Sequence, residues 1–166
     1  AAVAAAFALN LPTPAVACTA FQLKSNDGAQ IYFRSMEFGY PFNSKVLVVP
    51  RGTDFTGTGP GGKPGKKWTA TYGFVGLNVA IAPTVVADGQ NEKGLAIGML
   101  YLPGFAQNLD PEAAPADKSI GSWEVLNYLP ANCSSVVEAM VPTISFTLLI
   151  TFVIWPISLT VIDVES

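Results

Sequence analysis

The sequence contains no histidine, only two cysteines and few charged residues, which make up 13% of its 166 residues. Without histidine, the Ser-His-Asp and Cys-His catalytic arrangements are excluded, and so are most zinc sites. The nine Lys and Arg residues are scattered and the net charge is −3, so no basic stripe is available to neutralise a phosphate backbone. We therefore expect no nucleic-acid partner, no metal and no cofactor, and any nucleophile needs a base other than imidazole.

The first 17 residues are typical of the remains of an export signal. Residues 1–11 form an uncharged, alanine-rich apolar run, and Ala15-Val16-Ala17 is the small-x-small pattern that signal peptidase accepts. The positively charged opening of a signal is absent, so we interpret residues 1–17 as a signal-peptide remnant. Cleavage after Ala17 makes Cys18 the first residue of an exported, periplasmic or secreted protein, and residues 18–166 have the length of one domain.

Three alternatives remain open for this end of the chain. Residues 1–17 are also compatible with an apolar helix of a soluble domain. Ala-Val-Ala-Cys loosely resembles a lipobox, in which case Cys18 is acylated and the protein is lipid-anchored and not an enzyme. Because exported proteins form disulfides, Cys18 can also pair with Cys133. A free Cys133 at the start of a short helix is the simpler interpretation.

Residues 19–36 form the clearest local unit, a predicted β-hairpin. Two apolar stretches flank Ser25-Asn26-Asp27-Gly28, which suits a type I turn followed by a left-handed glycine. Pairing Ser25 with Ala29 sets Ala20 opposite Arg34 and places Arg34 on the same face as Cys18. Such diagonal neighbours have Cβ atoms about 7 to 8 Å apart, which a guanidinium can span. A slip of one residue would send Arg34 to the other face.

An N-terminal Cys18 carries its own base. A free α-amine has a pKa of about 7.7 to 8.0, so it can accept the thiol proton near neutral pH without histidine. A nearby Arg34 favours the thiolate and stabilises negative charge on an attacked carbonyl. The structural alternatives are a solvated Arg34 on an exposed strand and a Met36 that belongs to the core.

The next segment combines a strand with a glycine-rich loop. Residues 45–50 read as a buried strand, and residues 51–67 as a mobile surface loop rich in Gly, Pro and Lys. Residues 57–63 fit the first seven positions of a phosphate-binding P-loop. Pro64 stands where that motif needs Ser or Thr, and Pro60 prevents a clean helix start, so we exclude a phosphate site.

The remainder predicts further strands followed by helices. Residues 68–82 and 95–102 read as strands, and residues 88–94 as a turn cluster in which Asn91 and Glu92 are turn formers. After a Pro- and Ala-rich linker, residues 119–128 have helical spacing, and a second short helix starts at Ser134. Strands followed by helices predict an α+β fold.

Three ordered motifs, at residues 18–19, 33–38 and 87–95, resemble the successive signatures of the penicillin V acylase and bile salt hydrolase (choloylglycine hydrolase) family of N-terminal-nucleophile (Ntn) hydrolases. The similarity runs from Cys18 to about Met140. It implies a four-layer αββα sandwich and the hydrolysis of a linear, non-peptide amide bond in a small molecule.

The same resemblance implies roles for individual residues. Cys18 matches the nucleophile, Arg34 the active-site arginine, and Glu37 a position where members commonly have Asp to hold the α-amine. Tyr101 falls at the oxyanion position, where some penicillin V acylases carry Tyr and bile salt hydrolases usually carry Asn, which tilts the substrate toward an aryl-acyl amide. By the same resemblance, Met36 and Ile81 would line the apolar acyl pocket of the substrate site.

A later oxyanion Asn and a distal Arg of the family belong to a second half that these residues do not include. The resemblance therefore implies a truncated domain with impaired turnover, and a homotetramer for the full-length form. Conjugated bile salts and acyl-homoserine lactones remain alternative substrates to penicillin V. The uncharged segment 139–162 is long enough, at roughly 20 residues, for a membrane helix. Pro142, Pro156 and the β-branched composition favour paired strands instead.

Overall fold

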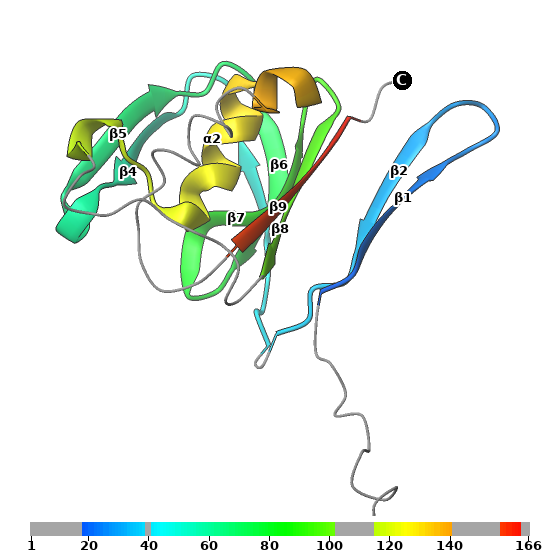
Figure 1. Ribbon diagram of the computed structural model, residues 1–166, viewed down its shortest axis with the longest axis horizontal. Helices are drawn as coiled ribbons and strands as arrows, with labels where there is room; N and C mark the ends of the chain where they lie inside the picture. The colour runs from blue at the N-terminus through cyan, green and yellow to red at the C-terminus, as the bar shows by residue number, and fades with distance from the viewer. Residues whose placement is uncertain (1–17, 39–40, 102–114, 141–156, 164–166) are drawn as a thin grey trace, which may run out of the picture.

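A five-stranded antiparallel sheet forms the centre of the computed structural model (Figure 1), which describes residues 18–38, 41–101, 115–140 and 157–163. The export-signal segment lies outside these residues and stays a prediction. All neighbouring strands in the sheet are antiparallel. In order across the sheet, the strands are β3 (Val46–Val49), β6 (Phe74–Val79), β7 (Ala82–Asn91), β8 (Leu95–Tyr101) and β9 (Ile157–Asp163).

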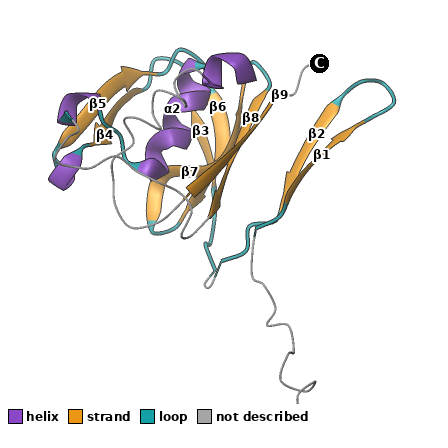
Figure 2. Ribbon diagram, viewed as in Figure 1, coloured by secondary structure: helices purple, strands orange, loops and turns teal. Residues whose placement is uncertain are grey.

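The predicted N-terminal hairpin is confirmed, including its register. It consists of β1 (Ala20–Lys24) and β2 (Gln30–Arg34), with Ala20 opposite Arg34. Ser25 N donates to Ala29 O at 2.8 Å, and Gly28 has φ of 93°, a conformation that glycine adopts at little cost. Figure 2 shows the hairpin on one side of the central sheet and the helices on the other.

Residues 51–67 are not a loop, and this expectation was wrong. They contribute β4 (Asp54–Thr58), the 3₁₀ turn η1 (Pro60–Gly62) and most of β5 (Pro64–Thr69), which form a second hairpin. The Phe55 and Trp68 rings stack across it with centroids 5.1 Å apart. Glu124 accepts hydrogen bonds from the Thr58 amide and hydroxyl, both at 2.7 Å. These tertiary contacts override the turn propensity of the local glycines and prolines.

Short helices cover one face of the central sheet. These are η3 (Ser122–Glu124), α2 (Val125–Asn132) and a helical stretch at 136–140, whereas η2 (Ala116–Lys118) packs against β5. The helix predicted at 119–128 therefore starts later and ends later. Buried side chains of the helices and of β6, β7 and β8 form the core, among them Phe74, Val86, Leu95, Ile97, Leu126 and Leu129.

Strand alternation leaves the other face of the sheet partly open. In β3, Leu47 and Val49 pack toward the core, whereas Val46 and Val48 are 67% and 69% exposed. The expectation of a fully buried strand was therefore wrong, because alternate side chains of a strand point to opposite faces and only one face meets the helices.

The turn predicted at 88–94 is shorter than expected, because β7 extends to Asn91. Asn91 is a turn former, as predicted: its Oδ1 accepts from the amides of Lys93 and Leu95 at 3.0 and 3.1 Å. Its Nδ2 donates to the carbonyls of Pro130 and Cys133 at 2.9 and 2.7 Å. This one side chain thus ties the β7–β8 turn to the helical layer.

Within the uncharged segment 139–162, residues 157–162 belong to β9, which confirms strand structure there. Strand β9 pairs with β8 over its whole length, from Leu95 opposite Asp163 to Tyr101 opposite Ile157. Residues 141–156 lie outside the described part. Among the described residues, no helix has both the length and the apolar character needed to cross a bilayer.

Candidate active site

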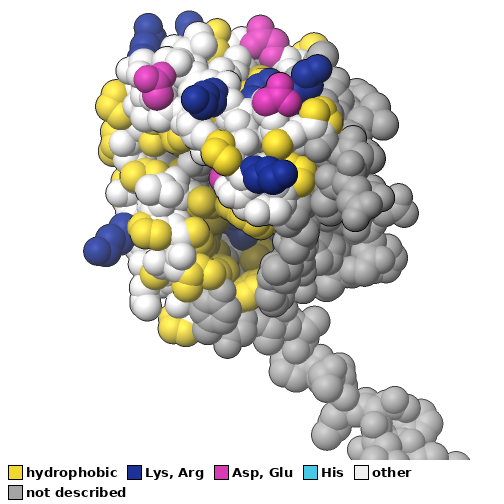
Figure 3. All heavy atoms as spheres, turned by 90° about the vertical axis from the view of Figure 1, so that its left-hand side faces the viewer, with side chains coloured by type: hydrophobic (Ala, Val, Ile, Leu, Met, Phe, Trp, Pro, Cys, Tyr) yellow, Lys and Arg dark blue, Asp and Glu magenta, His cyan; other side chains and the backbone are white. Residues whose placement is uncertain are grey.

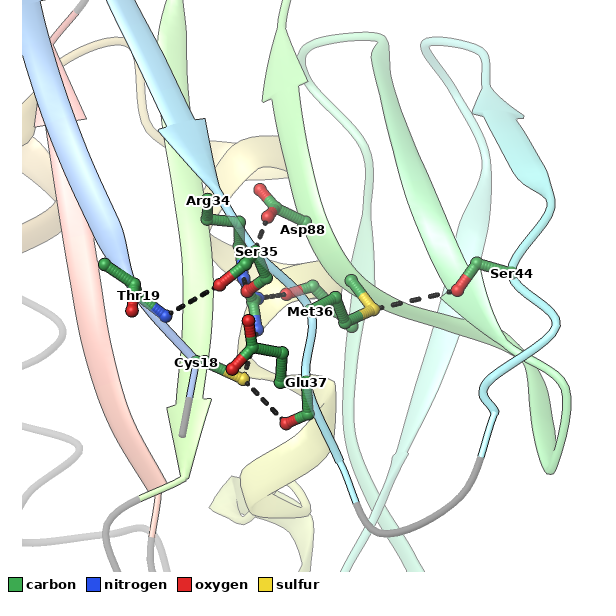
Figure 4. A network of polar contacts seen from close by, with 9 residues as sticks. Cys18, Thr19, Arg34, Ser35, Met36, Glu37, Ser44 and Asp88 are labelled. Atoms are coloured by element: carbon green, nitrogen blue, oxygen red, sulfur yellow. Dashed lines mark hydrogen bonds and ion pairs between the residues drawn. The ribbon is translucent and has the colours of Figure 1, made fainter. Parts of the chain in front are cut away.

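The candidate site is centred on Cys18, two residues before β1 (Figure 4). The Cys18 thiol donates to the Glu37 carbonyl oxygen at 3.3 Å. Its sulfur accepts a hydrogen bond from Arg34 Nη2, also at 3.3 Å. The predicted juxtaposition of Cys18 and Arg34 on one face of the hairpin is therefore present.

A short continuation of the hairpin ladder holds Cys18 in this place. Ser35 N donates to Thr19 O at 2.9 Å, and Thr19 N donates to the Ser35 hydroxyl at 3.1 Å. Because both bonds lie directly beyond the Ala20–Arg34 pair, the hairpin register carries Cys18 to the level of the arginine.

Arg34 is buried between the hairpin and the central sheet, with its side chain only 6% exposed. Nη1 donates to the Ala87 carbonyl at 3.1 Å, and Nε donates to its neighbour's carbonyl, Ser35 O, at 3.3 Å. Nε also lies 3.4 Å from Oδ2 of Asp88 in an ion pair. The alternative of a solvated Arg34 on an exposed strand is therefore wrong.

Asp88 is a site residue that the sequence analysis did not identify. Its side chain is 13% exposed. Burial raises the pKa of Asp88 to about 6, and the Arg34 guanidinium opposes part of that rise. Strand alternation does not find this residue, because in a regular strand Asp88 would share the helix-facing side of Val86. A register shift between β6 and β7 lies between these two residues and turns Asp88 toward the hairpin.

Tyr32 lies next to the same charged pair. Its hydroxyl is buried and has no hydrogen-bond partner in the described part of the chain. Burial, followed by the negative charge of Asp88, raises the pKa of Tyr32 to about 12. A Cβ on Gly98 of β8 would collide with the Tyr32 hydroxyl, so the hairpin side chain fits against the sheet here because residue 98 is a glycine.

The other predicted site residues occupy different positions. Glu37 lies beside Cys18 and binds it through its backbone, and Figure 4 shows its side chain turned back toward Cys18. Met36 Sδ accepts a hydrogen bond from the Ser44 hydroxyl at 3.7 Å. Ile81 occupies the β6–β7 turn and is 75% exposed. Tyr101 is the last residue of β8, and its side chain lies outside what the structure describes.

A pocket of about 420 Å³ adjoins Asp88 on the open face of the sheet. Neither Met36 nor Ile81 lines it. The lining residues come from β2, β3, β6, β7 and β8 and include Gln30, Tyr32, Val46, Val75, Leu77 and Gln90.

Cys133 is free and buried, and Cys18 is also free, so the two do not form a disulfide in this structure. Burial raises the pKa of the Cys133 thiol to about 11. Across residues 18–38, 41–101, 115–140 and 157–163, no cluster of three or more His, Cys, Asp or Glu residues could hold a metal ion. On the face shown in Figure 3, the Lys and Arg side chains stand apart from one another.

The described residues thus form a mixed α+β arrangement, in which helices cover one face of an antiparallel sheet and the hairpin that positions Cys18 and Arg34 lies on the other. Residues 18–160 match the family described as linear amide C-N hydrolases, choloylglycine hydrolase family. The chain belongs to this family, and the predicted family and fold class are confirmed.

This chain aligns with only part of the length of the proteins that it resembles. It is 32% identical over 123 residues to a bile salt hydrolase/transferase of Clostridium perfringens, covering 73% of this chain and 36% of that protein. It is 31% identical over 122 residues to a bile salt hydrolase/transferase of Bifidobacterium longum, covering 73% and 37%. The chain thus spans little more than a third of the length of these relatives.

Two solved structures share the fold. Penicillin V acylase from Agrobacterium tumefaciens superposes with a TM-score of 0.67 at 24% identity, over 87% of this chain and 43% of that chain. A mutant of conjugated bile acid hydrolase from Clostridium perfringens superposes with a TM-score of 0.65 at 25% identity, over 89% and 45%.

Proposed function

We propose that the mature protein hydrolyses a linear carbon-nitrogen amide bond and that Cys18 is the nucleophile. The observation that carries this proposal is the 3.3 Å contact between Arg34 Nη2 and the Cys18 sulfur, made by an arginine that is otherwise buried. A cation at this distance favours a negatively charged sulfur, the form of cysteine that attacks carbonyl carbon. The start of the family match at Cys18 supports the same assignment.

The reaction starts after removal of residues 1–17, which frees the α-amine of Cys18. The amine takes the thiol proton, and the thiolate attacks the substrate carbonyl to form a carbon–sulfur bond and a tetrahedral oxyanion. Arg34 stabilises the negative charge, Glu37 holds the α-amine, and Tyr101 contributes to the oxyanion site. The protonated amine then gives its proton to the leaving nitrogen as the carbon–nitrogen bond breaks.

The product of this first half is a thioester on Cys18. Water attacks the thioester carbonyl while the α-amine accepts a proton from the water, and collapse releases the carboxylic acid. The proton returns to the sulfur, which restores the starting enzyme. No group outside the terminal residue is needed as a base, which fits a chain that contains no histidine.

The first candidate substrate is an aryl-acyl amide such as penicillin V, because Tyr101 stands at the oxyanion position. Met36 and Ile81 would line the acyl pocket. A conjugated bile salt is the second candidate. The relatives with 32% and 31% identity favour it, since both are named bile salt hydrolase/transferase.

Turnover by the full-length mature protein, which starts at Cys18, tests this proposal. We expect hydrolysis of phenoxymethylpenicillin or glycocholate, and the ratio of the two rates identifies the acyl group. Replacing Cys18 with Ser should lower turnover by at least about 10³-fold while leaving the fold intact, because a hydroxyl is a much poorer nucleophile. Undiminished hydrolysis by Cys18→Ser would overturn the assignment.

We propose further that the protein is exported to the periplasm or secreted and that its full-length form is a homotetramer. The remaining alternative is a lipid-anchored protein without activity. Mass spectrometry of the native N-terminus distinguishes the two, since a free Cys18 supports the hydrolase and a diacylglyceryl adduct on Cys18 supports the lipid anchor. Light scattering on the mature protein gives the number of subunits.

A further inference from the structure

Asp88 is a buried carboxylate beneath the site, and the reaction described above does not use it. It lies in β7, opposite Leu77 of β6 and Gly98 of β8. Its ion pair with Arg34 joins two side chains that are 13% and 6% exposed. Burying a carboxylate is costly unless it is paired with a cation. The buried position of Asp88 is therefore explained by its ion pair with Arg34.

The donors of Arg34 divide into anchors and a single functional contact. Nε lies 3.4 Å from Asp88 Oδ2 and Nη1 donates to the Ala87 carbonyl at 3.1 Å, both on β7, while the hydrogen of Nε is donated to Ser35 O at 3.3 Å. Only Nη2 reaches Cys18. A guanidinium is planar, so fixing two of its nitrogens fixes the direction of the third.

The anchoring strand is an inner strand of the sheet. Strand β7 is hydrogen-bonded to β6 on one side and to β8 on the other. Tyr32 of β2 also lies against this pair, and the Tyr32 hydroxyl reaches Gly98. Asp88 and Ala87 thus belong to the central sheet, whereas Arg34 belongs to the hairpin and Cys18 to the residues that extend it.

We propose that Asp88 is a positioning residue that aims the Arg34 guanidinium at the Cys18 sulfur. The inference rests on the proposed function in one respect, namely that Cys18 is the reacting group. Two effects of Asp88 on that sulfur oppose each other. Its negative charge, acting through space, disfavours the thiolate, whereas its hold on Arg34 brings a positive charge to 3.3 Å from the sulfur.

The opposite signs make the proposal testable without substrate. The rate of Cys18 alkylation by iodoacetamide, resolved by peptide mass spectrometry, reports the thiolate at that residue alone. We expect Asp88→Ala to slow alkylation near pH 7 by about tenfold, the effect of losing one favourable charge at this range. Asp88→Asn should slow it less, because the amide keeps the volume of the carboxylate and a side-chain oxygen near Nε, which lies 3.4 Å from Oδ2 of Asp88.

Gln90→Ala is the matched control. Gln90 follows Asp88 by two positions on β7, lines the same pocket and is exposed and uncharged. Its replacement should leave the alkylation rate unchanged. The pH at which Cys18 reacts at half its maximal rate should rise in Asp88→Ala and stay constant in Gln90→Ala, a shift that loss of packing alone does not produce.

Alkylation in Asp88→Ala that is as fast as in the parent, or faster, overturns the proposal, because Asp88 then acts only through its charge. Buried Cys133 monitors folding, since it becomes reactive if a variant unfolds. If Asp88→Ala unfolds, the conservative variant decides: slower alkylation in Asp88→Asn supports positioning, and equal or faster alkylation contradicts it. The proposed function and the positioning role can fail separately. If the parent protein hydrolyses no amide but its Cys18 is still alkylated faster than in Asp88→Asn and Asp88→Ala, the proposed function is refuted and the positioning role of Asp88 is retained.

Discussion

Replacing Asn91 with Ala tests whether the β7–β8 turn is held to the helical layer by one side chain. Asn91 is 4% exposed and makes four hydrogen bonds with heavy-atom distances between 2.7 and 3.1 Å. A net contribution of about 1 kcal/mol per bond gives a loss of about 4 kcal/mol in the free energy of unfolding. A domain of this size has a total of roughly 5–15 kcal/mol, so the change is large.

The measurement is urea unfolding followed by circular dichroism. The free energies of parent and variant are compared after checking that both have the same m-value, the slope of the free energy against urea concentration. Gln90→Ala provides the control, because it removes an exposed amide from the adjacent position of the same strand and should change stability by less than about 0.5 kcal/mol. A loss of under about 1 kcal/mol in Asn91→Ala would refute the reasoning, since it would mean that water or a relaxed turn replaces all four bonds.

The other predictions concern the site and its surroundings. Burial raises the pKa of Asp88 to about 6, so protonation of Asp88 stabilises the folded protein fully below the ordinary pKa of the group, and this stabilisation is lost as the pH rises through about 6. The free energy of unfolding of Asp88→Asn, measured in urea, should lack this decline between about pH 4 and 7. The same pH dependence in parent and variant would contradict the prediction. Gly98→Ala should cost about 1–3 kcal/mol of unfolding free energy because its Cβ meets the Tyr32 hydroxyl. Tyr32→Phe should relieve part of that cost in a double-mutant cycle, and strict additivity would rule out this contact. Thiol titration at about pH 7 should find Cys18 reactive and Cys133 silent until urea is added, since burial raises the Cys133 pKa to about 11; two reactive thiols in the native protein would disprove the burial of Cys133.

The hairpin and its pair of site residues were predictable because they depend on local geometry. A turn with Asn, Asp and Gly fixes the loop length, the loop length fixes the register, and the register alone brings Arg34 to the face of Cys18. All of this information lies between Cys18 and Arg34.

Features that depend on distant packing were missed or misread. The segment at 51–67 contains the glycines and prolines of a loop, but Phe55–Trp68 stacking and Glu124 hold it as strands. Asp88 was taken for a turn residue because its partner, Arg34, is 54 positions earlier in the chain, which no local pattern reveals. The exposure of Val46 and Val48 likewise depends on which face of β3 the helices cover.

The most direct test of the account is to trap the acyl group during turnover. The mature protein is mixed with phenoxymethylpenicillin or glycocholate, quenched with acid within the first turnover and mapped by peptide mass spectrometry. A second protein, with one alanine inserted before Cys18, keeps the thiol and Arg34 but removes the primary amine from reach. We predict an acyl thioester on Cys18 in the first protein and none in the second. An acyl group on another residue, or equal acylation of the two proteins, would contradict an N-terminal cysteine that serves as its own base.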